Sequence, residues 1–282
     1  MRTIAIVSAV GGAGRTTLTA ALAGLLVARE HVALAVECDP RNVLAMHFGL
    51  RESAREGLVT HLAGSPGANN AWSRAALQSD DGVLVLPWGS LAAGAVSAPP
   101  GAPDDDASTQ LDARPGWLRE LLARVDLPPH AIALIDAGTW PSAHARQAID
   151  AADLVLGLLT PCATACATLP RFIATLAGAR KPSVFVANAV LPARQLHMDV
   201  IALLRARLGS AMLPYLVHAD TGVPAALAAG ENFCLSEPSS QAAHDLNGIA
   251  SWISHWSASA SPKAVEAPDA PLAPHPARGG TP

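Results

Sequence analysis

The sequence predicts an α/β fold in which a mostly parallel sheet is covered by helices on both faces. Two observations support this prediction. Short apolar runs alternate with helical patterns along the chain, which is the order that parallel strands with crossover helices produce. Several runs, such as residues 154–159, are apolar at every position, as strands buried on both faces are.

The elements follow one another without a visible repeat. We expect strands near residues 3–8, 32–37, 83–87, 131–136, 153–159, 183–188 and 213–217. We expect helices near residues 16–29, 58–64, 117–125, 143–150, 166–178, 196–208, 222–229 and 240–256. The sequence therefore predicts a single domain over residues 1–256.

Two segments break this pattern. Residues 97–116 hold four prolines and the run Asp104-Asp105-Asp106, which predicts an exposed inserted loop. Residues 257–282 consist mainly of Ala, Pro, Ser and Gly, a composition that predicts a disordered tail.

Composition limits the class of protein. No apolar run among the 282 residues approaches the roughly 20 that a membrane-spanning helix needs. The chain begins with a strand pattern and not with a signal sequence, so we expect a cytoplasmic protein whose four cysteines are reduced. A net charge of −4 gives no general attraction to nucleic acid.

The first strand runs directly into a glycine-rich turn and a helix. This arrangement wraps backbone N–H groups around a phosphate chain, and Thr16 is placed to offer a hydroxyl to Mg²⁺. The alternative is a glycine-rich turn that only packs tightly. The residues expected to bind the nucleotide phosphates are Gly11, Gly12, Ala13, Gly14, Arg15, Thr16 and Thr17.

The loop departs from the general pattern G-x-x-x-x-G-K-[ST] at two positions. Ala9 stands at the first glycine and Arg15 at the lysine. An arginine still neutralises phosphate charge, but it is longer and planar, so it is less suited to position the γ-phosphate for transfer. Nucleotide binding is therefore expected with Arg15 as the cation of the catalytic site, and rapid turnover is not.

Two expected strands end in acidic residues. Asp136 follows four apolar residues and would reach Mg²⁺ through a water, with Gly138 near the γ-phosphate. Glu37 would hold Mg²⁺-bound water, and Asp39 would orient or deprotonate the attacking water. Each acid could instead begin a loop or cap a helix. Two carboxylates at the carboxyl edge of one parallel sheet, where ligands bind in this architecture, favour the functional interpretation.

With these motifs the chain resembles the MinD/ParA group of dimerising P-loop ATPases, over residues 3 to about 256. Within that group it is most similar to the BcsQ (YhjQ) family of bacterial cellulose-secretion operons. The similarity rests on the loop and first helix over residues 11–23, on residues 38–48, and on Leu86-Pro87-Trp88-Gly89. The most family-specific stretch is 213–230, where His218 replaces a proline of the wider group.

The resemblance implies a homodimer with ATP and Mg²⁺ held between two subunits. It gives Asn188 the role of recognising adenine, and it places Val217, His218 and Asp220 on the other side of the base. Val10 stands where the group usually has a lysine that reaches the partner's phosphates. Together with Arg15, this substitution implies weak or absent hydrolysis.

The resemblance also implies an ATP-dependent switch that supports assembly, localisation or activity of the cellulose synthase and secretion complex. Its partners would be subunits of that complex, including a small BcsR-like polypeptide, and recruitment to the inner membrane would occur only through them. Partitioning ATPases, MinD-type positioners and a nucleotide-free scaffold are the alternatives. The chain has no Lys or Arg between Arg207 and Lys263, which argues against direct binding to DNA or lipid in that region.

Overall fold

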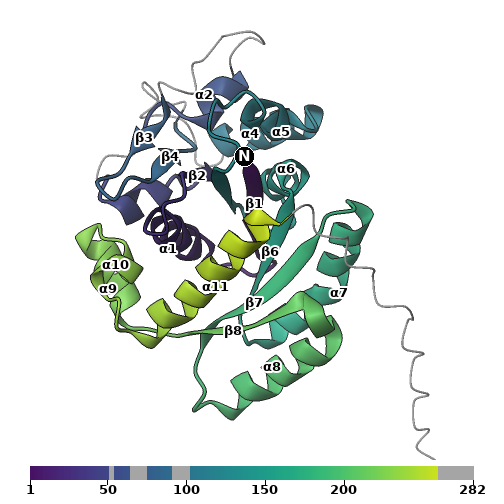
Figure 1. Cartoon of the computed structure of the whole chain (residues 1–282). Coiled ribbons are helices and arrows are strands. Elements are labelled where there is room, and N and C mark those ends of the chain that lie inside the picture. The colour runs from purple at the N-terminus through teal and green to yellow at the C-terminus, as the bar shows by residue number, and fades with distance from the viewer. Residues whose placement is uncertain (51–53, 64–74, 91–101, 260–282) are drawn as a thin grey trace, which may run out of the picture.

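The computed structural model describes residues 1–50, 54–63, 75–90 and 102–259. At its centre lies an eight-stranded sheet with the order β3-β4-β2-β5-β1-β6-β7-β8, shown in Figure 1. Every neighbouring pair is parallel except β3 and β4. The strands are β1 (Arg2–Val7), β2 (Ala33–Cys38), β3 (Leu77–Gln78), β4 (Leu84–Leu86), β5 (Ile132–Ala137), β6 (Leu154–Leu159), β7 (Ser183–Val190) and β8 (Met212–His218).

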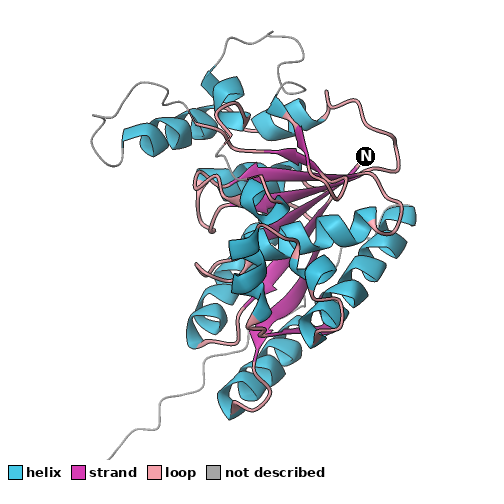
Figure 2. Cartoon of the chain, turned by 90° about the vertical axis from the view of Figure 1, so that its left-hand side faces the viewer, coloured by secondary structure: helices cyan, strands magenta, loops and turns pink. Residues whose placement is uncertain are grey.

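Helices cover both faces of the sheet, as the edge-on view in Figure 2 shows. One face is covered by α1 (Arg15–Val27), the short helix η1 (Leu44–Phe48), α10 (Phe233–Ser236) and α11 (Gln241–Ala258), with α9 (Gly222–Ala229) beside them. The other is covered by α2 (Leu58–Ala63), α4 (Ala102–Ala113), α5 (Trp117–Leu122), α6 (Ala143–Ala151), α7 (Ala163–Gly178) and α8 (Gln195–Leu208), and η2 (Gly209–Ala211) precedes β8. The predicted α/β fold with a mostly parallel sheet is confirmed.

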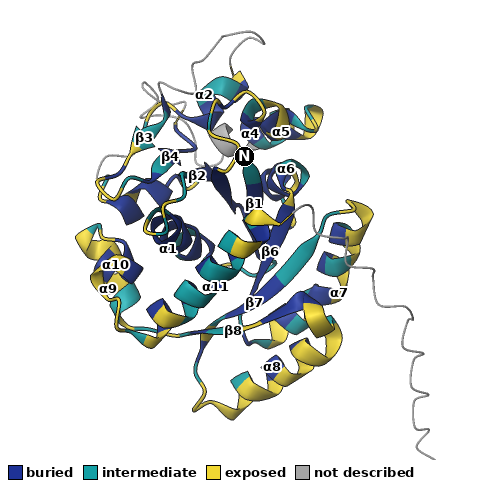
Figure 3. Ribbon diagram, viewed as in Figure 1, coloured by how far each residue is buried: buried dark blue, intermediate teal, exposed yellow. Residues whose placement is uncertain are grey.

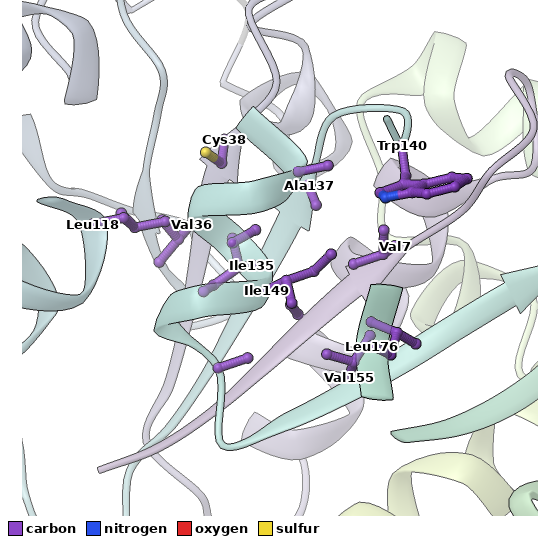
Figure 4. Packing of buried hydrophobic residues seen from close by; sticks show 14 of the residues in the cluster. Val7, Val36, Cys38, Leu118, Ile135, Ala137, Trp140, Ile149, Val155 and Leu176 are labelled. Atoms are coloured by element: carbon purple, nitrogen blue, oxygen red, sulfur yellow. The ribbon is translucent and has the colours of Figure 1, made fainter. Parts of the chain in front are cut away.

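The core has two halves because side chains alternate along each buried strand. In β1, Ile4 and Ile6 belong to the half of the core that includes α1 and α11, whereas Ala5 and Val7 belong to the half that includes α6. Figure 3 shows the strands buried along the middle of the molecule, and Figure 4 shows the packing around Val7 and Ile135. Since β1 is central and fully covered, the loop that follows it starts from a rigid support.

The first strand is also fixed to the last helix. The Arg2 guanidinium lies over the Trp256 ring at 5.6 Å from its centroid, and Arg2 Nη2 donates to the carbonyl of Ser259 at 3.0 Å. Among the described helices none is both long and apolar enough to cross a membrane.

The structure corrects the prediction of an exposed loop over residues 97–116. Residues 102–113 form α4, and Ala107 and Leu111, one helical turn apart, are buried in the core. Burial of this face outweighs the turn-forming composition, which alone suggested a loop. Residues 97–101 lie outside the described part of the chain. Of the segment 257–282, α11 includes residues 257 and 258, and residues 260–282 lie outside the described part.

Candidate nucleotide-binding site

The glycine-rich loop connects β1 to α1 at the carboxyl edge of the sheet. Gly12 and Gly14 adopt positive φ values of 70° and 88°, a backbone region that favours glycine. Gly14 is the N-cap of α1 and supplies no side-chain cap. The first amides of α1 are therefore free to bind an anion at the positive end of the helix dipole.

Asn188 of β7 lies directly against this loop. Its side-chain Nδ2 donates to the carbonyl of Ala13 at 2.7 Å. A Cβ added to Gly14 would lie 2.5 Å from the same nitrogen, so any other residue there would have to displace the Asn188 side chain. The structure thus brings Asn188 to the edge of the loop, and its role in recognising adenine stays a prediction.

Arg15 is buried, with 3% of its side chain exposed, and it points into the protein. Its Nε donates to the carbonyl of Ala137 at 2.8 Å, Nη1 to the carbonyl of Val10 at 3.3 Å, and Nη2 to the Thr139 hydroxyl at 2.9 Å. Burial lowers the pKa of Arg15, against the opposing effect of nearby Asp136 and Asp39. Arg15 therefore ties the phosphate loop to the segment after β5.

Asp39 follows β2 and has a carboxylate surrounded by donors. Arg41 Nε donates to Oδ1 at 2.9 Å and Nη2 donates to Oδ2 at 2.6 Å, and the Arg41 amide donates to Oδ1 at 3.1 Å. Arg15 Nη2 lies 3.6 Å from Oδ2. Burial acts to raise the pKa of Asp39, but the bonds from Arg41 outweigh it and the pKa is lowered.

Glu37 and Asp136 occupy paired positions on the neighbouring strands β2 and β5. Glu37 Oε1 accepts the amides of Val43 at 2.5 Å and Leu44 at 2.8 Å, so this carboxylate fixes the start of η1. Its Oε2 is buried without a partner among the described residues. Burial is the main cause that raises the pKa of Glu37 to about 8.

Asp136 is fully buried, and neither of its oxygens has a hydrogen bond of standard geometry with a described residue. Burial raises the pKa of Asp136 to about 7, and the nearby Thr16 hydroxyl acts in the opposite direction. Buried carboxylate oxygens without partners are costly. Such a cost is consistent with a site that a ligand completes.

The residues present fit a magnesium ion that accompanies a nucleotide. Oxygen atoms of Asp136, Glu37 and the Thr16 hydroxyl are the ligands that this ion prefers, directly or through water. The described residues contain no cluster of three His, Cys, Asp or Glu side chains for a metal held by protein alone.

The other residues predicted to bind the nucleotide also lie at the carboxyl edge of the sheet, but the side chain of Val217 is buried. Val217 has only 4% of its surface exposed and packs in the core, so its side chain does not line a pocket and only its backbone could contact a base. His218 Nδ1 lies 2.6 Å from Asp245 Oδ2. Asp220 Oδ1 accepts the Gly222 amide at 2.8 Å, at the start of α9. Gly138 is closely surrounded, since an added Cβ would lie 3.2 Å from His144 Cβ.

Sequence reasoning did not find Arg41, Thr139 or Asp245. Arg41 was detectable in principle, because it stands two residues after an expected catalytic acid. Thr139 and Asp245 carried no such signal, since their partners Arg15 and His218 are far away in the sequence.

Comparison with known proteins identifies the relatives of this chain. The family model described as "Cellulose biosynthesis protein BcsQ" matches residues 1–253. The comparison with curated proteins gave no match.

Solved structures share the fold at low sequence identity. The cell division ATPase MinD of Pyrococcus furiosus is 22% identical, with a TM-score of 0.68 over 90% of this chain and 99% of that chain. MinD of Pyrococcus horikoshii complexed with Mg-ADP is 20% identical, with a TM-score of 0.70 over 91% and 97%. Cobyrinic acid a,c-diamide synthase of Mycobacterium smegmatis, with a bound ATP analogue and magnesium, is 18% identical, with a TM-score of 0.69 over 93% and 98%.

Proposed function

Because the chain belongs to the BcsQ family of cellulose biosynthesis proteins, we propose that it is an ATP-binding dimeric switch for the bacterial cellulose synthase and secretion complex. It would support assembly, localisation or activity of that complex, with weak or absent hydrolysis. The observation that carries the proposal is an open helix N-terminus at Gly14 beside buried carboxylate oxygens, both of Asp136 and Oε2 of Glu37, that lack hydrogen-bond partners among the described residues.

In this proposal each part of the site has a separate task. Main-chain amides of the loop from Gly11 to Thr17 hold the phosphates. Thr16, Asp136 and Glu37 hold Mg²⁺, which neutralises phosphate charge when bound. Asn188 contacts adenine from one side, and His218, Asp220 and the backbone of Val217 contact it from the other. Mg-ADP in the P. horikoshii MinD structure supports this choice of ligand.

We expect slow hydrolysis because neither Arg15 nor Val10 places a positive charge on the phosphates. The Arg15 nitrogens are directed at Val10, Ala137 and Thr139, so the side chain must leave these groups before it can grip a phosphate. Val10 itself supplies no charge. An ATP-bound dimer would therefore persist, which suits a protein that assembles other subunits, including a small BcsR-like polypeptide.

A route for the switch starts at Glu37. This carboxylate fixes the start of η1, and the turn after η1 touches α9, where a Cβ on Gly49 would lie 3.0 Å from the Gly230 carbonyl. Met46 and Leu227 on these two helices are exposed by 44% and 37%. If Glu37 turns toward Mg²⁺, the positions of these exposed apolar side chains change, and partner binding would change with them.

We expect the purified protein to elute as a dimer with ATP and Mg²⁺ and as a monomer without either. Gel filtration with light scattering measures the mass, and a phosphate-release assay run alongside measures slow or undetectable turnover. Thr16→Ala should remain monomeric, because it lacks the hydroxyl that would bind Mg²⁺. A monomer under all conditions, or turnover at ordinary ATPase rates, would contradict the proposal.

A further inference from the structure

We propose that Arg41 is a positioning residue that slows ATP hydrolysis by occupying both oxygens of the Asp39 carboxylate. The inference rests on the proposed function, since it concerns the fate of bound ATP. It goes further by assigning part of the slow turnover, beyond the effects of Arg15 and Val10, to one removable side chain.

The geometry leaves Asp39 little capacity to bind water. Asp39 is 4% exposed, and Arg41 donates to both of its oxygens in the bidentate arrangement that suits a guanidinium and a carboxylate. The Arg41 amide adds a bond to Oδ1, and Arg15 lies 3.6 Å from Oδ2. One acceptor position remains, on Oδ2, and the Arg15 guanidinium lies beside it, so a water has little room to bind this carboxylate.

Occupation of the Asp39 carboxylate would slow hydrolysis because this group would act on the attacking water. In hydrolysis the oxygen of a water bonds to the γ-phosphorus, and the bond from that phosphorus to the β–γ bridging oxygen breaks, giving ADP, inorganic phosphate and one proton. Asp39 would accept a hydrogen bond from the water and take its proton, which then passes to solvent. A carboxylate with three of its four acceptor positions occupied by Arg41 orients that water poorly.

Arg41 differs from Arg15 in how firmly it is fixed. The Arg41 side chain is 58% exposed, and in the described part of the chain its side-chain hydrogen bonds all go to Asp39. Arg15 is buried and bonds two segments, the phosphate loop at Val10 and residues 137–139 at the end of β5. Removing Arg41 therefore frees the carboxylate and leaves the link between the loop and the sheet intact.

The test compares steady-state hydrolysis in Arg41→Gln, Arg41→Lys and the parent protein. A general base contributes about 10²–10⁴-fold to a rate. We therefore expect kcat of Arg41→Gln to exceed that of the parent protein at least about tenfold. The KM for ATP should change by less than about threefold. Arg41→Lys keeps the charge but lacks the bidentate fork, so its kcat should fall between the two. The double variant Arg41→Gln/Asp39→Asn should lose the gain.

Arg119→Gln is the matched control, because Arg119 also pairs with an aspartate, Asp150, at an exposed position on α5. It should leave kcat unchanged. An unchanged or lower kcat in Arg41→Gln, or a gain that survives Asp39→Asn, would overturn the role of Arg41. ATP binding is measured first with a fluorescent ATP analogue. A parent protein that binds none would overturn the proposed function itself, whereas binding with no gain in kcat would overturn the role of Arg41 alone.

Discussion

Replacing Asp136 by Asn is expected to stabilise the nucleotide-free protein at pH 8 and to abolish Mg²⁺-dependent ATP binding. With a pKa of about 7 against an ordinary 3.8, ionising the buried carboxylate costs folding about 4 kcal/mol at that pH. Asparagine keeps the shape without the charge. Because its amide stays incompletely bonded, we expect a net gain of about 1–3 kcal/mol in the free energy of unfolding.

The raised pKa values also predict how the free energy of unfolding changes with pH. The raised pKa values of Asp136, about 7, and Glu37, about 8, mean that the folded state holds these protons more tightly than the unfolded state does. Their contribution to stability is complete at low pH and is lost as pH rises through 7 and 8. Between pH 5.5 and 8.5 the parent protein should lose stability, and Asp136→Asn should lose less.

Urea unfolding at both pH values measures this difference. The control is Asp112→Asn, because Asp112 pairs with Arg146 at an exposed position and should leave the slope with pH unchanged. Titration with ATP, with and without Mg²⁺, measures the second effect. Equal slopes in parent and Asp136→Asn, or Mg²⁺-dependent affinity that survives the substitution, would show that Asp136 is not the ionising metal ligand.

Gly14→Val is expected to abolish ATP retention and dimer formation. A branched side chain at φ 88° strains the backbone by about 1–3 kcal/mol. Its Cβ would also displace Asn188, whose Nδ2 lies 2.5 Å from the Cβ position and bonds the Ala13 carbonyl. The substitution therefore disturbs the phosphate loop and the expected adenine contact together.

The measurement is gel filtration with ATP and Mg²⁺, together with the amount of nucleotide that co-elutes. Gly178→Val serves as the control, since an added Cβ there meets nothing within 4 Å. It should elute and retain ATP like the parent protein. Unchanged elution and ATP retention in Gly14→Val would show that the phosphate loop does not bind ATP.

The sequence was a good guide where periodic patterns were long. Strands such as 154–159 were predicted to within a residue because continuous apolar runs indicate burial on both faces. Helix α4 was missed because its acidic, proline-flanked sequence resembles a loop, and only packing of Ala107 and Leu111 reveals it. Elements as short as β3 and η1 carry too few residues for a pattern.

In the candidate site, too, the sequence predicts some features and misses others. Glu37 and Asp136 could be placed together because the ends of parallel strands meet at one edge, and the structure pairs them in register. The direction of Arg15 could not be predicted. The loop pattern suggested a cation facing phosphate, but its partners Ala137 and Thr139 lie more than a hundred residues away in the sequence.

The contacts between Arg2 and the end of α11 limit how far the chain can be shortened at its C-terminal end. Trp256 and Ser259 hold the first residue of the strand that carries the phosphate loop. Trimming the protein back past Trp256 would withdraw that support and loosen the central strand at its base. Truncated versions made for crystallisation or binding work should therefore extend at least to Ser259.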